Sequence, residues 1–225
     1  MKQILFSTPM VQAILAGRKT QTRRTLKFQM INGVPHNDFK LCGSIYDPAE
    51  NEVKSGSAHD FESNDGEWMN FAYTNIAEGD ILWVRETYLY CVDDSFLEGM
   101  DSRYVYKASI HPDWYKALRE HDKSYKWIPS IHMPKAVARI FLKVKSVKVE
   151  GLHDISHVDA VAECLHREWD GQHFWYSNYK KPNEMTTSSI FSYATLWESI
   201  NGTGSWDANP WVWVYEFERI EKPNN

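Results

Sequence analysis

Ala138-Arg139-Ile140-Phe141-Leu142-Lys143-Val144-Lys145-Ser146-Val147-Lys148-Val149 alternates apolar and polar residues over most of its length. A period of two is typical of a β-strand that buries one face. The apolar set lies on even positions up to Val144 and on odd positions from Val147, so the phase shifts near Ser146. A bulge or bend explains such a shift and is common where a sheet curls into a barrel. The stretch therefore predicts a long, bent strand in a small curled sheet.

Further strands and helices are expected on both sides of this strand. Thr8 followed by Pro9 supplies a hydroxyl cap and a first-turn proline for a helix that Gly17 ends. Ser156 with Asp159 three residues on predicts the start of another helix. The additional strands are expected at 4–6, 81–88, 103–108 and 211–217, and the additional helices at 112–121 and 190–200.

This order of elements predicts an α+β fold, because several strands are neighbours in sequence and helices are excursions between them. The expected architecture is a small, curled, mostly antiparallel β-barrel with flanking helices. Residues 28–75 are turn-rich with little periodicity, and residues 166–187 read as an aromatic loop. Both stretches are interpreted as long insertions in a single domain that spans residues 1–225.

The helix near residue 160 carries a candidate acid. Its expected inner stripe consists of Ile155, Val158, Val161, Ala162 and Leu165. Asp159 and Glu163 share the other side, four residues apart. By composition alone, Glu163 reads as a solvated surface glutamate.

Bulk composition limits the class of protein. The chain has 225 residues, of which 43% are hydrophobic, and its net charge is −5. This charge disfavours a grip on long duplex DNA and leaves a local basic patch for a nucleoside or a single strand. No apolar run approaches the ~20 residues of a membrane span, and 4–6 is too short for a signal peptide. A cytoplasmic protein without a membrane partner is therefore expected.

Metal and disulfide chemistry are both disfavoured by the sequence. Cys42, Cys91 and Cys164 are odd in number, far apart and without CxxC spacing. His153 and His157 are four residues apart but lack a nearby third ligand. We therefore expect no metal site and no cofactor.

The segment Gly17-Arg18-Lys19-Thr20-Gln21-Thr22-Arg23-Arg24 concentrates four cations and two hydroxyls in eight residues. Mutual repulsion would lower the pKa of Lys19, more so if it is partly buried, and such a lysine can act as a base near neutral pH. Arginines make forked contacts to phosphate or carboxylate. On charge count alone, however, a solvated basic turn is the commoner explanation.

A resemblance to a known family favours a functional site over a solvated turn at residues 17–24. The pattern Gly17-x-Lys19-x-x-x-x-Arg24 after a short helix resembles the signature of the ASCH family, whose fold is a PUA-like β-barrel. Three later stretches resemble the family's further landmarks, and two more resemble its members from bacteriophages and prophages. The landmarks are Gly79-Asp80 to Glu86, Leu152-His153-Asp154-Ile155 through Ala162-Glu163, and Trp211 to Phe217; the phage-like stretches are Ser7-Thr8-Pro9-Met10 and Ser205 to Pro210.

The resemblance implies a function and a set of site residues. PUA-like domains bind RNA or modified bases, and one ASCH branch is an amidohydrolase that removes acetyl from the exocyclic amine of acetylcytidine without a metal. Its catalytic lysine, threonine and glutamate correspond by motif position to Lys19, Thr22 and Glu163. The expected substrate-binding residues are Arg24, Thr20, Arg85, Glu86 and Trp83, with Arg18 and Arg23 as flanking charge.

Two alternatives stay open beside the amidohydrolase. One is a non-catalytic module that binds single-stranded RNA or a modified base, and the other is a ribonuclease. The mixture of aromatic and basic residues at 169–181 suits stacking on unpaired bases, at ~1–3 kcal/mol per base. The same composition suits a loop packed on the barrel, which is the slightly favoured interpretation.

Overall fold

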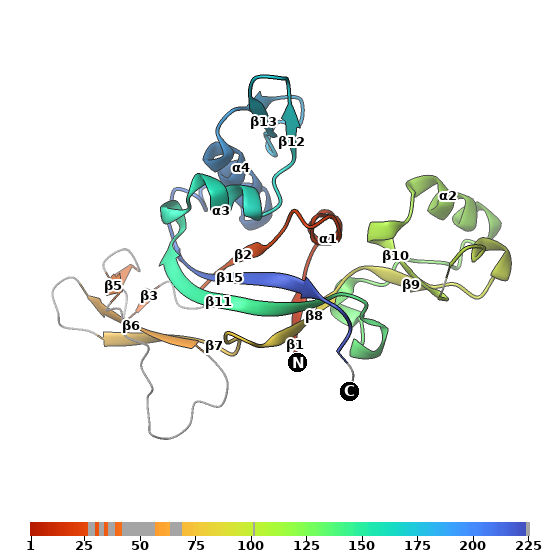
Figure 1. Ribbon diagram of the computed structural model, residues 1–225, viewed down its shortest axis with the longest axis horizontal. Coiled ribbons are helices and arrows are strands. Elements are labelled where there is room, and N and C mark those ends of the chain that lie inside the picture. The colour runs from red at the N-terminus through yellow and green to blue at the C-terminus, as the bar shows by residue number, and fades with distance from the viewer. Residues whose placement is uncertain are drawn as a thin grey trace. The chain divides into compact units, whose positions relative to one another are not determined.

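A computed structural model describes residues 1–26, 30–31, 34–35, 39–41, 57–63, 69–100 and 102–223 (Figure 1). The protein is a mixed α+β protein with several sheets, as the sequence predicts. The chain divides into two compact units, each made of segments far apart in sequence. Unit 1 comprises Met1–Gly17, Ile81–Lys143 and Glu218–Asn225, and unit 2 comprises Arg18–Asp80 and Val144–Phe217. The single domain over 1–225 stays a prediction.

Unit 1 pairs the N-terminal strand with the middle of the chain. β1 (Lys2–Leu5) lies parallel to β8 (Ile81–Arg85), and β8 lies antiparallel to the first residues of β11 (Phe141–Gly151). The other elements of unit 1 are α1 (Thr8–Leu15), β9 (Tyr88–Tyr90), β10 (Tyr104–Tyr106), α2 (Pro112–His121) and short 3-10 helices at Asp94–Phe96, Lys107–Ser109, Ser130–His132 and Lys135–Val137.

The helix signals of unit 1 are largely confirmed. α2 spans the predicted residues, and Gly17, with φ of +69°, follows the end of α1. The expected N-cap at Thr8 is wrong by one residue, because Ser7 has the extended backbone that precedes the first helical turn. The expected strand 81–88 is divided, since β8 ends at Arg85 and β9 begins at Tyr88.

Unit 2 contains the rest of the long strand. β11 continues through Ser146 without interruption, and β15 (Trp211–Ile220) pairs antiparallel with β2 (Gln21–Thr25). β11, β15 and β2 are successive neighbours in the sheet. The buried apolar positions of β11 are even-numbered at Leu142 and Val144 and odd-numbered at Val149. The predicted phase shift is therefore confirmed.

Two helices of unit 2 pack around one apolar cluster. α3 (His157–Ala162) begins at the predicted capping box of Ser156 and Asp159, and α4 (Ser189–Asn201) matches the second predicted helix. The cluster consists of Leu152, Ile155, Ala160, Leu165, Tyr176, Tyr193, Trp197, Val212 and Val214. No described helix is both long and apolar enough to cross a bilayer.

The predicted inner stripe of α3 is wrong in phase. Val158 is 74% exposed, whereas Ala160 is buried. The helix has only six residues and is followed by a turn in which Cys164 has φ of +89°. The helical period therefore does not extend from Ile155 to Leu165, although both of those side chains are buried.

The two predicted insertions contain more regular structure than expected. Strands at 57–63 and 69–74 contradict the prediction of an irregular 28–75 segment, and strands at 167–169 and 174–177 contradict the loop at 166–187. These strands belong to two of three small antiparallel sheets in the described part of unit 2. Their members are β3 (Met30–Ile31) with β4 (Val34–Pro35), then β5 (Phe39–Leu41), β6 (Ser57–Ser63) and β7 (Met69–Thr74), then β12 (Arg167–Trp169), β13 (Phe174–Ser177) and β14 (Met185–Thr186).

Asp170 organises the turn between β12 and β13. Its carboxylate accepts the backbone N–H groups of Gln172 and His173 at 2.7 Å each, and the indole N–H of Trp175 at 2.6 Å. Because these donors favour the ionised form, they lower the pKa of Asp170 to about 2.

We expect NMR titration of the Asp170 carboxyl carbon to give a pKa of about 2. The depressed pKa means that the carboxylate stabilises the turn fully above its ordinary value of 3.8 and loses that contribution as pH falls toward 2. Trp175→Phe removes the strongest donor and should move the pKa upward. An unchanged titration in this variant would contradict the role of the indole.

Candidate functional site

The basic segment 17–24 does not form one solvated turn. Arg18 and Arg24 are exposed, whereas Lys19 and Arg23 retain only 2% and 4% of their accessible surface. The cations therefore separate into an outer and an inner pair. The expectation that all four repel one another does not hold for the inner pair, because carboxylates of unit 2 surround it.

Backbone contacts hold the start of this segment in place. Lys19 forms an isolated antiparallel bridge with Glu163, and the Thr20 N–H donates to the Ala162 carbonyl at 3.0 Å. On the other side, the Phe217 N–H donates to the Thr20 carbonyl at 2.8 Å. The segment is thus held between the end of α3 and strand β15, while the Thr20 side chain stays exposed.

Lys19 and Glu163 form a buried ion pair across 144 positions of the chain. Lys19 Nζ lies 2.9 Å from Glu163 Oε2, and the exposed fractions of the two side chains are 0% and 5%. The ammonium also donates to the Glu163 carbonyl at 3.2 Å and to the Gln21 carbonyl at 2.7 Å. An ammonium group has three donors, so this buried cation is fully hydrogen-bonded. The interpretation of Glu163 as a solvated surface residue, which composition alone favours, is therefore wrong.

Arg23 lies at the centre of the carboxylates. Its Nε and Nη2 donate to Glu150 Oε1 at 3.0 and 2.6 Å, and its Nη1 donates to Glu163 Oε1 at 3.2 Å. Nη2 also lies 3.6 Å from Asp159 Oδ2. Burial opposes the charge of the guanidinium, but Glu163 and Glu150 outweigh that effect, and the pKa of Arg23 is raised. Arg23 is therefore a structural centre of the site and not a flanking charge.

Gln21 and Asp159 close the network on the helix side. Gln21 donates to Asp159 Oδ1 at 2.8 Å and accepts from Arg23 Nη1 at 3.1 Å. Partial burial works against ionisation of Asp159, yet the hydrogen bonds from Ser156 and Gln21 and the charge of Arg23 lower its pKa. The half-exposed Lys148 lies 2.9 Å from Glu150. The cluster therefore contains three cations and three carboxylates, namely Lys19, Arg23 and Lys148 with Glu150, Asp159 and Glu163. Because the charges of this cluster balance, its buried members Lys19, Arg23 and Glu163 are compatible with a stable fold.

Thr22 lies on the other face of β2. Successive strand side chains alternate, so Gln21 and Arg23 share one face and Thr22 points away from it. Thr22 stands opposite Tyr215, whose hydroxyl is 2.7 Å from the Thr74 hydroxyl. The Thr22 side chain is 3% exposed, and within the described part of the chain its hydroxyl has no hydrogen-bond partner. The structure thus joins Lys19 to Glu163 but leaves Thr22 outside their hydrogen-bond network.

Two further groups border the ion pair. Tyr193 of α4 is buried, and this burial together with the charge of Glu163 raises its pKa well above 10. Cys164 follows Glu163 with φ of +89°, a region that costs ~1–3 kcal/mol for a residue other than glycine. Burial raises the pKa of the Cys164 thiol. The backbone that carries Glu163 is therefore strained beside a neutral thiol and a neutral phenol.

The remaining predicted binding residues belong to unit 1 and have internal partners there. Trp83 is a core residue, and Arg85 donates to the Ser130 carbonyl and to Gln3 Oε1 at 3.0 Å each. Glu86 is buried and accepts two hydrogen bonds from Arg139 at 2.8 and 3.0 Å. Arg85 and Glu86 thus each have separate partners within unit 1.

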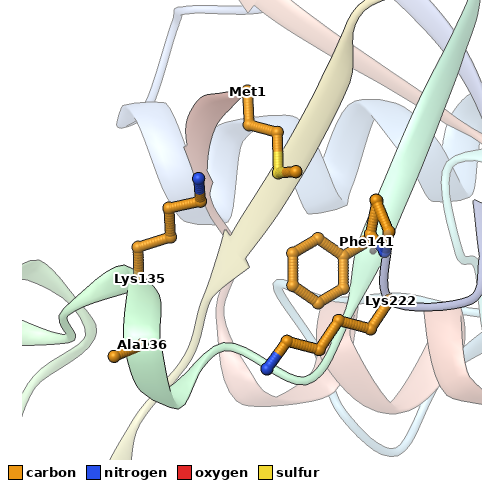
Figure 2. Close-up of a pocket in the computed structure, with 6 residues that line it drawn as sticks. Met1, Lys135, Ala136, Phe141 and Lys222 are labelled. Carbon is orange, nitrogen blue, oxygen red and sulfur yellow. The ribbon is translucent and has the colours of Figure 1, made fainter. Parts of the chain in front are cut away.

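Two surface pockets are lined by residues other than the predicted site residues. One, in unit 1, has a volume of about 260 Å³, and the ring of Phe141 forms part of its wall beside Lys222 (Figure 2). The other, in unit 2, has a volume of about 500 Å³ between the β13–β14 segment and α4, where Lys180 pairs with Glu198 at 2.8 Å. None of the sequence-predicted site residues lines either pocket. The first is lined by Met1, Lys135, Ala136, Phe141, Lys222 and Pro223.

Sequence reasoning missed Arg23, Glu150 and Gln21 as members of the site. A signal was present, because alternation along β2 puts positions 21 and 23 on one face. Asp159 and Glu163 were correctly expected to share one side of their helix, four residues apart. In the described part of the chain, no three His, Cys, Asp or Glu side chains come together as a metal site requires.

Comparison with known proteins gives no relative from which a role could be transferred. No family model, no curated protein and no solved structure matches this chain.

Proposed function

We propose that the Lys19–Glu163 pair is the acid–base centre of a hydrolase that removes an acyl group from the exocyclic amine of a modified cytidine such as acetylcytidine. The observation that carries the proposal is the 2.9 Å contact between two buried, oppositely charged groups 144 positions apart. These are the two residues that the ASCH resemblance singles out. The proposal includes the PUA-like barrel of that family, of which the neighbouring strands β11, β15 and β2 form a part.

The reaction begins with a proton transfer inside the pair. Lys19 Nζ gives a proton to Glu163 Oε2 along their hydrogen bond, which leaves a neutral amine and a carboxylic acid. The amine then takes a proton from a water molecule, and the resulting hydroxide adds to the acyl carbonyl carbon. The tetrahedral intermediate collapses with cleavage of its C–N bond, and the Lys19 ammonium protonates the departing amine. The products are a carboxylic acid and the free cytidine.

The other residues of the site have supporting roles in this proposal. Arg23 holds Glu163 Oε1 at 3.2 Å and acts as a positioning residue. We assign the nucleophile to water, because the Thr22 hydroxyl has no hydrogen bond to Lys19 and Thr22 alternates away from Arg23. Lys19 and Glu163 are buried, so neighbouring side chains must move when the substrate enters.

A binding module without chemistry is the second candidate. Trp169 and Phe174 are exposed on the β12–β13 hairpin, which favours a surface for unpaired bases. In this case the buried ion pair serves stability alone. Either candidate implies a cytoplasmic protein with a nucleoside or a single strand as its partner.

Turnover of acetylcytidine by the wild-type protein and by Lys19→Met tests the proposal. We expect the wild type to release acetate and cytidine, and Lys19→Met to lose activity by about 100-fold or more, the size of one acid–base contribution. Phe191→Ala, an exposed substitution on α4, serves as the matched control with full activity. Retention of single-stranded RNA by a wild type that forms no product would support the binding module instead. Strand cleavage would support a ribonuclease.

A further inference from the structure

The β12–β13 hairpin presents one face with an unusual composition. Trp169 stands directly opposite Phe174, and Arg167 stands opposite Tyr176. Directly opposed residues of an antiparallel pair share a face, so these four side chains lie on one side and Glu168 with Trp175 on the other. Tyr176 is buried in the core of unit 2, whereas the other three continue outward from it. We call Arg167, Trp169 and Phe174 the stacking face.

The aromatic members of the stacking face are exposed to solvent. Trp169 is 57% exposed and Phe174 is 41% exposed, and their ring centroids lie 4.7 Å apart. The interpretation of this stretch as a loop packed on the barrel is therefore wrong for Trp169 and Phe174. In Figure 1 the hairpin extends beyond α4, on the side away from β2 and β15. Exposed aromatic side chains that lie together and are rimmed by polar residues are typical of an interaction surface.

A cation completes the stacking face. The guanidinium carbon of Arg167 lies 4.5 Å from the ring centroid of Phe174, and in the described part of the chain Arg167 has no ion pair. The carboxylates of the hairpin do not compete for it. Glu168 points to the other side, and the three hydrogen bonds within the turn occupy Asp170. The stacking face therefore combines two partly exposed aromatic rings with a guanidinium group that lies over one of them and forms no ion pair with the described residues.

We propose that the stacking face binds unpaired bases of a single-stranded nucleic acid. Such a strand alternates aromatic bases with phosphates, which matches exposed rings beside an uncompensated arginine. The inference deepens the proposed function and rests on it for one element, namely that the acylated base belongs to a strand and is not a free nucleoside. Trp169 follows Glu163 by six residues, so their Cα atoms are at most about 22 Å apart. A strand that passes the hairpin thus stays within a few nucleotides of the Lys19–Glu163 pair.

Fluorescence anisotropy with labelled oligonucleotides tests the stacking face. The probes are an unstructured single-stranded RNA, a single-stranded DNA of the same sequence and the corresponding RNA duplex, all without acylated bases. We expect Trp169→Ala and Phe174→Ala each to weaken single-strand binding by about 5- to 150-fold. Trp169→Phe should restore most of the affinity, because it keeps a ring. Arg167→Gln should reduce the salt dependence, lowering the slope of log K against log salt by about 0.7.

The control is Phe191→Ala, which removes a 52% exposed aromatic from α4 and should bind as the wild type does. Thermal melting of each variant verifies that its fold is intact. Single-strand binding that is unaffected in the double variant Trp169→Ala/Phe174→Ala would overturn the inference. So would equal affinity for the duplex, or a hairpin-dependent self-association of the protein without RNA binding. A preference between RNA and DNA identifies which strand is the partner.

The outcome separates this inference from the proposed function. A wild type that binds unmodified RNA through the hairpin but deacylates no substrate would refute the hydrolase and retain the stacking face. A wild type that deacylates acetylcytidine, with hairpin variants that bind RNA normally, would refute the stacking face alone.

Discussion

Glu163→Gln is expected to lower the turnover of acetylcytidine by about 100- to 10,000-fold while the protein remains folded. Glu163 accepts Lys19 on one carboxylate oxygen at 2.9 Å and Arg23 on the other at 3.2 Å. Glutamine keeps the size of the side chain but cannot accept the proton that frees the lysine amine. It also turns an N–H₂ group toward one of the two cations. The defect should therefore appear in kcat more than in KM.

Two further variants make this prediction specific. Glu163→Asp retains the charge but shortens the side chain, and we expect partial activity because the carboxylate no longer spans both cations. Glu184→Gln removes an exposed carboxylate that pairs with Lys181, and it should leave turnover at the wild-type level. Stopped assays of cytidine release and a thermal melt of each protein provide the measurements. Wild-type turnover in a well-folded Glu163→Gln variant would refute the acid–base assignment.

Arg23→Met is expected to destabilise the protein by about 3–5 kcal/mol, because it leaves buried carboxylates without their cation. The guanidinium contacts Glu150, Asp159 and Glu163 and is itself completely buried. Urea unfolding measures the loss. Arg18→Met is the matched control, since the neighbouring Arg18 is exposed and should change stability by no more than about 0.5 kcal/mol.

A double-mutant cycle and a pH series extend the test of Arg23. Glu150→Gln should cost much less in the Arg23→Met background than in the wild type, because the two groups share one interaction. The pKa of Asp159 is lowered in the folded state, so its contribution is present above its ordinary value and is lost as pH falls through the lowered one. The difference between wild type and Arg23→Met should therefore shrink in acid. Equal urea midpoints for the two proteins at neutral pH would contradict the role of Arg23.

The strands and helices with regular apolar periods could be predicted from the sequence. The phase shift in β11, the capping box at Ser156 and the two helices α2 and α4 all follow from local patterns. Strands β6 and β7 could not be predicted in this way, because their residues mix polar and aromatic types without a clear alternation. The β12–β13 hairpin was missed for a similar reason. Its partner strands have only three and four residues, and pairing between them depends on the turn that Asp170 closes.

The side chains that can take part in the site follow from local sequence patterns. Lys19, Thr22 and Glu163 are the residues that the resemblance to the ASCH family implies, and Arg23 is one of four clustered cations. Which of these groups come into contact depends on long-range packing. Contact between Lys19 and Glu163 requires the end of α3 to lie against the segment before β2, and charge counting cannot reveal this long-range pairing. Because side chains alternate along β2, Thr22 and Arg23 lie on opposite faces of the strand. Of the four cations in residues 17–24, Arg18 and Arg24 are exposed, whereas Lys19 and Arg23 are buried and ion-paired. The physical reason is that a charge can be buried only where opposite charges from distant segments surround it.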